Sequence, residues 1–165
     1  MASHVKGAAQ QEHVLRAKGI SGLLLSDVRE VVSEIRQEKE LDLFDALKAL
    51  TQNIPGLKVD MNVVVDESMV DARQAEVIVR CVQEAITNIV KHAQASYCNI
   101  NLLSSDRDLH LCVADNGNCE GEIIPGNGLT GIAERVEKID GRLDYHSGAN
   151  GFSLNVTLPK IKLVR

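Results

Sequence analysis

The sequence predicts a two-layer α/β sandwich, in which a mixed sheet is covered on one face by helices, with a helical extension at the N-terminal end. Three observations support this prediction. Segments with apolar residues at three- and four-residue steps are interspersed with short, valine- and leucine-rich segments that come mostly in pairs. Apolar residues make up 44% of the chain and aromatic residues only 2%, so the core is expected to be aliphatic. The length of 165 residues suits one domain of ordinary size.

Four segments have the periodicity of helices. Residues 21–40 carry apolar side chains on one helical face, and charged residues occupy the other faces. The next helices are expected from about Leu43 to Asn53 and from Asp71 to about Ala93, which is the longest. A fourth is expected from about Leu129 to Asp140. Gly141 follows it, where a left-handed C-terminal cap is predicted.

Five segments are predicted to be strands. One stands alone before the longest helix, and the other four form two pairs, each joined by a short polar turn. The predicted strands are Leu57–Val65, Tyr97–Leu103, Leu109–Ala114, Arg142–His146 and Phe152–Leu158.

Composition excludes several functional classes. The net charge is −5 and lysines and arginines do not cluster, so no nucleic-acid partner is expected. No apolar run approaches the roughly 20 residues that span a bilayer, and no signal peptide is evident, which predicts a cytosolic polypeptide. The four cysteines have no CxxC spacing, and three of them lie in apolar runs, so free buried thiols are favoured over disulfides or a metal site.

The longest predicted helix carries a polar stripe. Glu84, Asn88 and Lys91 are spaced i, i+4 and i+7, and His92 lies one turn after Asn88. A carboxylate, an amide and two potential cations on one face suit a metal-bound polyphosphate, because hard oxygen ligands take Mg²⁺ and cations take phosphate charge. A solvated polar face explains the stripe equally well.

Two further features follow in the chain. Asp115 ends a predicted strand and precedes Asn116-Gly117, so its carboxylate is a candidate acceptor for an amino group such as that of adenine, although an ordinary Asx turn is the simpler explanation. Residues 126–131 have the spacing GxGxxG before a predicted helix, where backbone N–H groups can approach an anion. The spacing fits neither a P-loop nor, after a loop, a Rossmann fingerprint, and a surface loop explains it about as well.

Together and in this order, the three features resemble the ATP-binding domain of sensor histidine kinases, within the wider group that includes DNA gyrase, Hsp90 and MutL. Residues 84–95 resemble the N box of the nitrate-sensor and DesK-like branch. Residues 115–117 resemble the first glycine box and residues 126–131 the second. The resemblance covers about residues 21–159 and implies a Bergerat-type ATP-binding fold with ATP and Mg²⁺ as cofactors.

The resemblance also implies roles for individual residues. Asn88 would be the Mg²⁺ ligand, and Glu84 the acidic catalytic residue that polarises water or helps to position metal and nucleotide. Lys91 and His92 would lie near the phosphates, while Asp115 would bind the adenine amino group. Gly117 would allow close approach of the base. Gly126, Gly128 and Gly131 would form the hinge of a mobile lid, and Leu129 between them would belong to the nucleotide site.

By the same resemblance, residues 41–165 would be the catalytic domain, and residues 21–40 the remnant of the second helix of a dimerisation and phosphoacceptor hairpin. Residues 1–20 form a poorly defined N-terminal segment. None of the five histidines matches the phosphoacceptor motif, so that histidine is expected on a separate hairpin. The implied partners are this hairpin, a response regulator and a second copy of a homodimeric parent protein. A cytoplasmic domain is implied, in a parent that the family often anchors in the membrane.

Two positions depart from the family pattern. Asn127 stands where the branch commonly has histidine, and Phe152 stands where a threonine usually supports adenine recognition. These departures keep open a degenerate nucleotide pocket that serves as a protein-interaction module. An anti-sigma-factor serine kinase of the same fold is the other alternative, which the hairpin-like segment over residues 21–53 disfavours.

Overall fold

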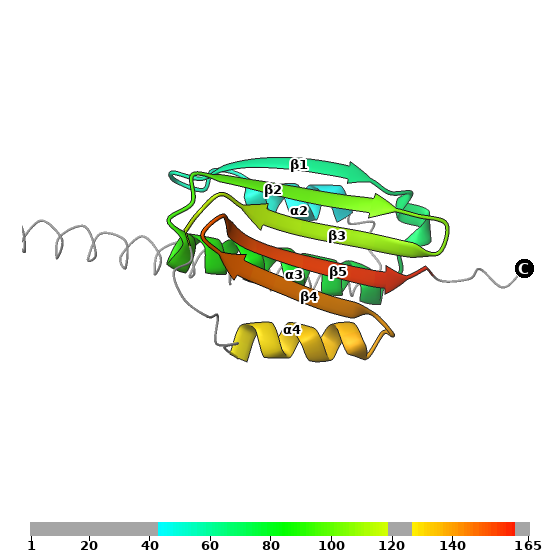
Figure 1. Ribbon diagram of the computed structural model, residues 1–165. Helices are drawn as coiled ribbons and strands as arrows, with labels where there is room; N and C mark the ends of the chain where they lie inside the picture. The colour runs from blue at the N-terminus through cyan, green and yellow to red at the C-terminus, as the bar shows by residue number, and fades with distance from the viewer. Residues whose placement is uncertain (1–42, 119–126, 161–165) are drawn as a thin grey trace, which may run out of the picture.

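The computed structural model describes residues 43–118 and 127–160 of the chain. These residues form one five-stranded sheet with its helices packed on one face (Figure 1). The predicted two-layer sandwich with a mixed sheet is therefore confirmed. The N-terminal segment and the helix expected over residues 21–40 lie outside the described residues, and so does most of the expected glycine-rich loop.

The α-helices agree with the predicted segments except at their ends, whereas the short turn η1 was not predicted. They are α2 (Leu43–Thr51), a short 3₁₀ turn η1 (Glu67–Met69), α3 (Ala72–Asn88), a π-helical turn η2 (Ile89–Ala93) and α4 (Asn127–Glu137). The helical stretch predicted from Asp71 to about Ala93 is confirmed, and its last turn is π-helical, since the α-helical pattern ends at Asn88 and η2 continues the helix to Ala93.

The strands are β1 (Lys58–Val64), β2 (Tyr97–Ser104), β3 (Asp108–Asp115), β4 (Arg142–Gly148) and β5 (Gly151–Pro159). Their order in the sheet is β1-β2-β3-β5-β4 (Figure 1). Strands β2 with β3 and β4 with β5 are antiparallel pairs joined by tight turns, whereas β1 and β2 run parallel. Parallel neighbours need a crossover connection, and α3 supplies it.

Side chains within α3 and beyond it fix where this helix begins. The Asp71 carboxylate accepts a hydrogen bond from the backbone N–H of Gln74 at 2.6 Å, and the Gln74 side chain accepts one from the backbone N–H of Asp71, which completes a capping box. The Gln74 side chain also donates to the carbonyl of Pro159 at 2.7 Å. The start of α3 is thereby tied to the end of β5.

Helix α4 ends differently from the prediction. The left-handed residue is Asp140, with φ of 56°, and the N–H of Gly141 donates to the carbonyl of Val136 at 2.9 Å. This pattern places Gly141 one residue later in the capping motif than expected. A glycine is needed at position 141 for packing instead, since a Cβ added there would lie 2.6 Å from a methyl group of Leu158.

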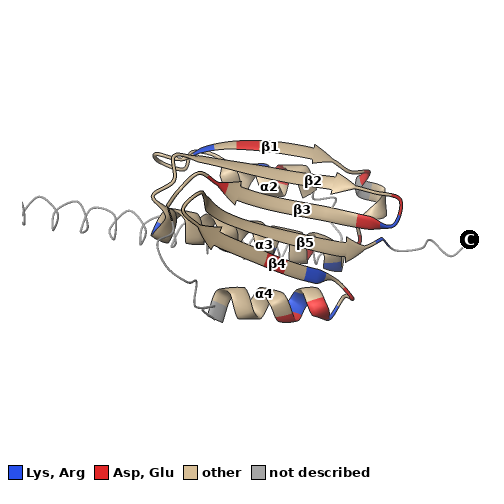
Figure 2. Cartoon of the chain, in the orientation of Figure 1, with Lys and Arg blue, Asp and Glu red and all other residues tan. Residues whose placement is uncertain are grey.

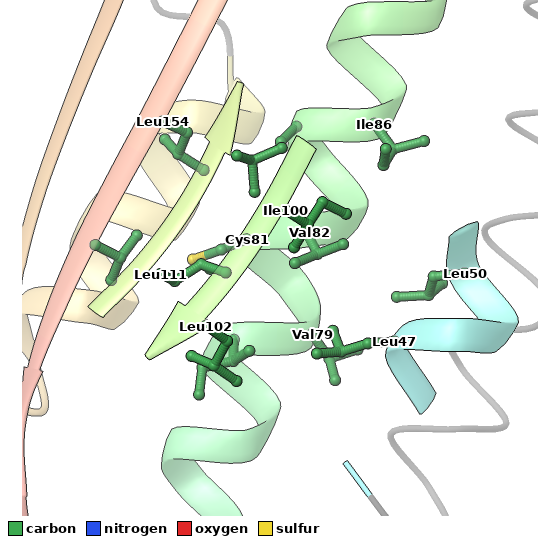
Figure 3. Packing of buried hydrophobic residues seen from close by; sticks show 14 of the residues in the cluster. Leu47, Leu50, Val79, Cys81, Val82, Ile86, Ile100, Leu102, Leu111 and Leu154 are labelled. Carbon is green, nitrogen blue, oxygen red and sulfur yellow. The ribbon is translucent and has the colours of Figure 1, made fainter. Parts of the chain in front are cut away.

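The core lies between the sheet and the helices and is aliphatic, as the composition predicts. Figure 3 shows side chains of α2 and α3 meeting those of β2, β3 and β5. The labelled members are Leu47, Leu50, Val79, Cys81, Val82, Ile86, Ile100, Leu102, Leu111 and Leu154. All are at most 2% exposed.

The alternation of β3 has a consequence for the site. Leu109, Leu111 and Val113 are buried on the face of the sheet that carries the helices. Successive side chains of a strand point to opposite faces, so Asp115 belongs to the same row. A carboxylate therefore occupies the last core-facing position of a central strand.

Candidate functional site

Asp115 is held in a defined orientation at the end of β3. It is 7% exposed. Its Oδ1 accepts a hydrogen bond from the N–H of Gly117 at 2.6 Å, and its Oδ2 accepts one from the N–H of Phe152 at 3.3 Å. The first contact is the Asx turn that the sequence suggested, while the second reaches across the sheet to β5. Burial raises the pKa of the carboxyl, and the two amide hydrogen bonds oppose this rise.

Gly117 brings the end of β3 against the π-helical turn η2. A Cβ on this residue would lie 2.1 Å from the carbonyl oxygen of Ala93, so only glycine allows the approach. The N–H of Asn118 donates to the same carbonyl at 2.9 Å. The structure thus gives Gly117 a packing reason for being glycine, whereas its expected role at a nucleotide base stays a prediction.

The polar stripe of the sequence spans the junction of α3 and η2. Glu84 and Asn88 are half-buried in the last two turns of α3, and Lys91 and His92 are exposed on η2. The π-helical turn ends at Gln94, which has a left-handed φ of 47°. Single π-helical turns occur frequently at functional sites.

A cavity of about 360 Å³ lies between α3 and α4. Its lining residues are Arg80, Gln83, Glu84, Thr87, Lys91, Gly128, Gly131, Ile132 and Arg135. Glu84 and Lys91 thus line the same cavity as two of the predicted glycines, Gly128 and Gly131. Asn88, His92, Asp115 and Gly117 are not among its described lining residues.

The glycine-rich segment is more helical than expected. Helix α4 begins at Asn127, so Gly128 and Gly131 lie in its first turns instead of preceding it. Burial of Leu129, Ile132 and Val136 on one face outweighs the weak helix propensity of glycine. The side chain of Leu129 is 4% exposed and belongs to the core, and Gly126 lies outside the described residues.

Gly128 lies directly against Glu84. A Cβ on Gly128 would be 2.0 Å from Oε1 of the Glu84 carboxylate. This contact joins α3 to the start of α4, which are far apart in the sequence. The start of α4 consequently determines how much room the Glu84 carboxylate has.

Five lining residues of the cavity were missed by the sequence reasoning: Arg80, Gln83, Thr87, Ile132 and Arg135. The spacing of Arg80 and Thr87 relative to Glu84 is helical, so the polar stripe could have been extended to them. Arg135 lies i+4 from Gly131 and forms an ion pair of 3.9 Å with Glu76 on α3. That partner could not be found from periodicity, because it depends on how the two helices pack.

Phe152 participates through its backbone. Its N–H supports Asp115, but its side chain is 3% exposed and belongs to the hydrophobic core. A phenyl ring therefore fills core space next to the carboxylate, at the position where the family resemblance leads us to expect a hydroxyl group. No sequence pattern signals the backbone contact, since any residue except proline can donate it.

Charges of both signs are mixed over the described elements instead of gathering in one region (Figure 2). In the parts of the chain that the structure describes, no group of three or more His, Cys, Asp or Glu side chains is arranged to hold a metal ion. Within the same residues, no helix has both the length and the apolar character needed to cross a bilayer.

A mixed sheet with helices on one face defines a two-layer α/β sandwich, and the buried carboxylate of Asp115 at the end of a central strand marks its candidate site. The sequence pattern of the histidine kinase-like ATPase domain matches residues 47–142. The chain belongs to this family, and the expected relationship is confirmed.

Individual relatives agree with the family. Sensor histidine kinase YxjM of Bacillus subtilis (strain 168) is 31% identical over 140 residues, which is 82% of this chain and 34% of the relative. Sensor histidine kinase DesK of the same organism is 29% identical over 142 residues, 82% of this chain and 37% of the relative. The chain thus spans about a third of the length of these relatives.

A solved structure supports the fold. The histidine kinase domain of the Erythrobacter litoralis EL346 blue-light activated histidine kinase superposes with a TM-score of 0.63 and 22% sequence identity. The match covers 82% of this chain and 79% of that chain. At this level of identity the likeness concerns the fold alone.

Proposed function

We propose that this chain is the ATP-binding catalytic domain of a two-component sensor histidine kinase. It transfers the γ-phosphate of ATP to a histidine on a separate hairpin, for relay to a response regulator. The observation that carries the proposal is the buried Asp115 carboxylate, which a central strand aims at the helical layer and which two backbone amides hold in place.

Asp115 is suited to reading the amino group of adenine. Each carboxylate oxygen can accept more than one hydrogen bond, so Oδ1 and Oδ2 retain acceptor capacity beyond their amide donors. An acceptor that is largely removed from water discriminates strongly, because a ligand without a matching donor leaves it unpaired. Guanine presents a carbonyl oxygen where adenine has the amine, so adenine is the favoured base.

The α3–η2 junction is suited to a metal-bound triphosphate. Asn88 would supply one oxygen ligand, which fits Mg²⁺ since this ion usually takes few protein ligands and completes its shell with phosphate oxygens and water. Lys91 and His92 are exposed on η2 and can meet phosphate charge. Mg²⁺ would supply further charge neutralisation, which is a main requirement of phosphoryl transfer.

We expect Glu84 to act on the acceptor. It lines the cavity between α3 and α4, where a reacting group can enter. As a carboxylate it can accept a proton from, or orient, the attacking imidazole. Its contact with Gly128 restricts its position, which is expected of a group whose orientation matters.

The relatives are named sensor histidine kinases, which supports a proposal about the parent protein and its partners. We propose a homodimeric parent protein that contributes the phosphoacceptor hairpin, a response regulator as downstream partner, and the cytoplasm, where ATP is present, as the location of this domain.

Calorimetric titration of ATP, with and without Mg²⁺, tests the proposal. Wild-type protein is expected to bind Mg·ATP, and at 100 times the Kd the ligand stabilises the fold by about 2.7 kcal/mol. Asn88→Ala should lose the Mg²⁺-dependent part of the affinity, whereas Asp115→Asn should bind ATP at least about tenfold more weakly with or without the metal. Asp144→Asn is the matched control, because that carboxylate is on β4, 62% exposed and paired with Arg142.

The absence of ATP binding by the wild-type protein would overturn the proposal and favour an interaction module. If ATP binds, the protein is mixed with a phosphoacceptor hairpin and radiolabelled ATP. Acid-labile phosphate on the hairpin supports histidine phosphorylation. Its absence would contradict the histidine kinase assignment and favour a serine kinase of the same fold.

A further inference from the structure

We propose that Asn116 is a positioning residue, which clamps the end of β3 to the turn between η2 and β2 and so fixes the orientation of Asp115. The inference rests on the proposed function, since it concerns how the base-binding carboxylate is held. Asn116 is not expected to touch the nucleotide.

The contacts of Asn116 converge on two residues. Its Oδ1 accepts hydrogen bonds from the backbone N–H of Ser96 at 3.0 Å and from that of Tyr97 at 2.9 Å. Its Nδ2 donates to Oγ of Ser96 at 3.1 Å. Its backbone N–H donates to the carbonyl of Tyr97 at 3.1 Å. One residue thus makes four hydrogen bonds to a segment about twenty positions earlier in the chain.

This pattern is not that of a local turn. In an Asx turn the side chain accepts from the N–H two residues later, as Asp115 does with Gly117. The side chain of Asn116 instead bridges two separate parts of the chain, and it is exposed, so it does not fill core space. Its contribution is therefore the bridge.

The bridge lies beside the two contacts that define the site. Asp115 precedes Asn116, and Gly117 follows it with its N–H on the Asp115 carboxylate. Gly117 and Asn118 also meet the carbonyl of Ala93, the last residue of η2. Because η2 carries the cations and β3 carries the base acceptor, the clamp fixes the distance between the two halves of the proposed site.

Loss of the clamp should therefore weaken nucleotide binding more than it weakens the fold. The exposed amide makes three side-chain hydrogen bonds, each contributing a modest amount to stability. Small displacements of positioned groups, however, have large effects on recognition. We expect Asn116→Ala to bind ATP about tenfold more weakly and to prefer ATP over GTP less strongly.

Two further variants separate positioning from a general structural effect. Asn116→Asp keeps an oxygen for the two amides and can accept from the Ser96 hydroxyl, so it should recover most of the affinity. Asn101→Ala is the matched control. Asn101 also forms side-chain hydrogen bonds on the sheet, with Asn62 and Asn99, but it lies near the middle of β2, several residues from the clamp.

The experiment measures the Kd for ATP and for GTP by calorimetry, and the melting temperature of the ligand-free protein, for all four proteins. The expected result is a weaker and less selective Asn116→Ala, recovery in Asn116→Asp, and ATP affinity within twofold of wild type in Asn101→Ala. Wild-type affinity and selectivity in Asn116→Ala would overturn the clamp alone and leave the proposed function standing. Equal loss of affinity in Asn116→Ala and Asn101→Ala would also overturn it. A wild-type protein that does not bind ATP would overturn both proposals.

Discussion

Replacement of Gly117 by alanine is the most direct test of how the two halves of the site are packed. The new Cβ would lie 2.1 Å from the carbonyl oxygen of Ala93 and 2.8 Å from its carbonyl carbon. Both atoms belong to the backbone, so no side chain can rotate away and the chain must move by roughly 1 Å. Forced overpacking of this kind costs about 1–3 kcal/mol.

The movement also threatens two hydrogen bonds, from Asn118 to Ala93 at 2.9 Å and from Gly117 to Asp115 at 2.6 Å. At about 1 kcal/mol each, they bring the expected loss in the free energy of unfolding to about 3–5 kcal/mol. For a domain of this size the melting temperature should fall by about 6–20 °C.

Gly131→Ala is the matched control, since it makes the same chemical change in a different environment. A Cβ on Gly131 meets no atom within 4 Å apart from its own stretch of helix backbone, and the residue lies inside α4. Alanine should therefore stabilise the helix by about 0.5–1 kcal/mol. Urea denaturation and thermal melting of both variants check the opposite signs. A Gly117→Ala protein that melts within 2 °C of wild type would refute the packing argument.

Two other predictions concern titratable groups. Because burial raises the pKa of Asp115 above the reference value of 3.8, its stability contribution is fully present below that value and is lost as pH rises through the folded-state pKa. As the pH falls from 7 to 4, the free energy of unfolding of the wild-type protein, measured by urea titration, should thus rise relative to that of Asp115→Asn. A difference between the two proteins that does not change with pH would contradict this. Burial also raises the pKa of Cys81 and of Cys98 to about 12. Burial raises the pKa of Cys112 too, but this thiol is only partly buried and lies on the other face of the sheet. In a Cys119→Ser background, a thiol reagent at pH 8 should modify Cys112 first and the two buried thiols only on unfolding, and native-state labelling of Cys81 would contradict the burial.

Much of the fold follows from local sequence patterns. The alternation of Leu57–Val65 and the helical period of residues 71–93 each predicted an element within a few residues of its observed bounds. These patterns are reliable because a strand or helix that buries one face must repeat its apolar residues at the period of its backbone. The parallel pairing of β1 with β2 could not be predicted from these local patterns, since it depends on the crossover through α3.

The helix ends were less predictable. Gly141 was expected to be the left-handed cap, but Asp140 takes that conformation and Gly141 is required by the contact with Leu158. Gly128 was assigned to a loop, yet it lies in the first turn of α4. In both cases tertiary packing outweighed the local preference of glycine, which amounts to only about 1 kcal/mol.

By itself, the sequence determined the family and predicted a site made by a helix with Glu84 and Asn88 and a strand that ends in Asp115. Those residues could be proposed from the sequence because their chemistry and spacing are local properties of the chain. Only the tertiary structure decided how they are held, through the amide of Phe152 on Asp115 and the side chain of Asn116 on the turn before β2. These contacts join segments twenty to forty residues apart. The donor in each is a backbone N–H, which nearly every residue has, so no pattern of residue types could have revealed them.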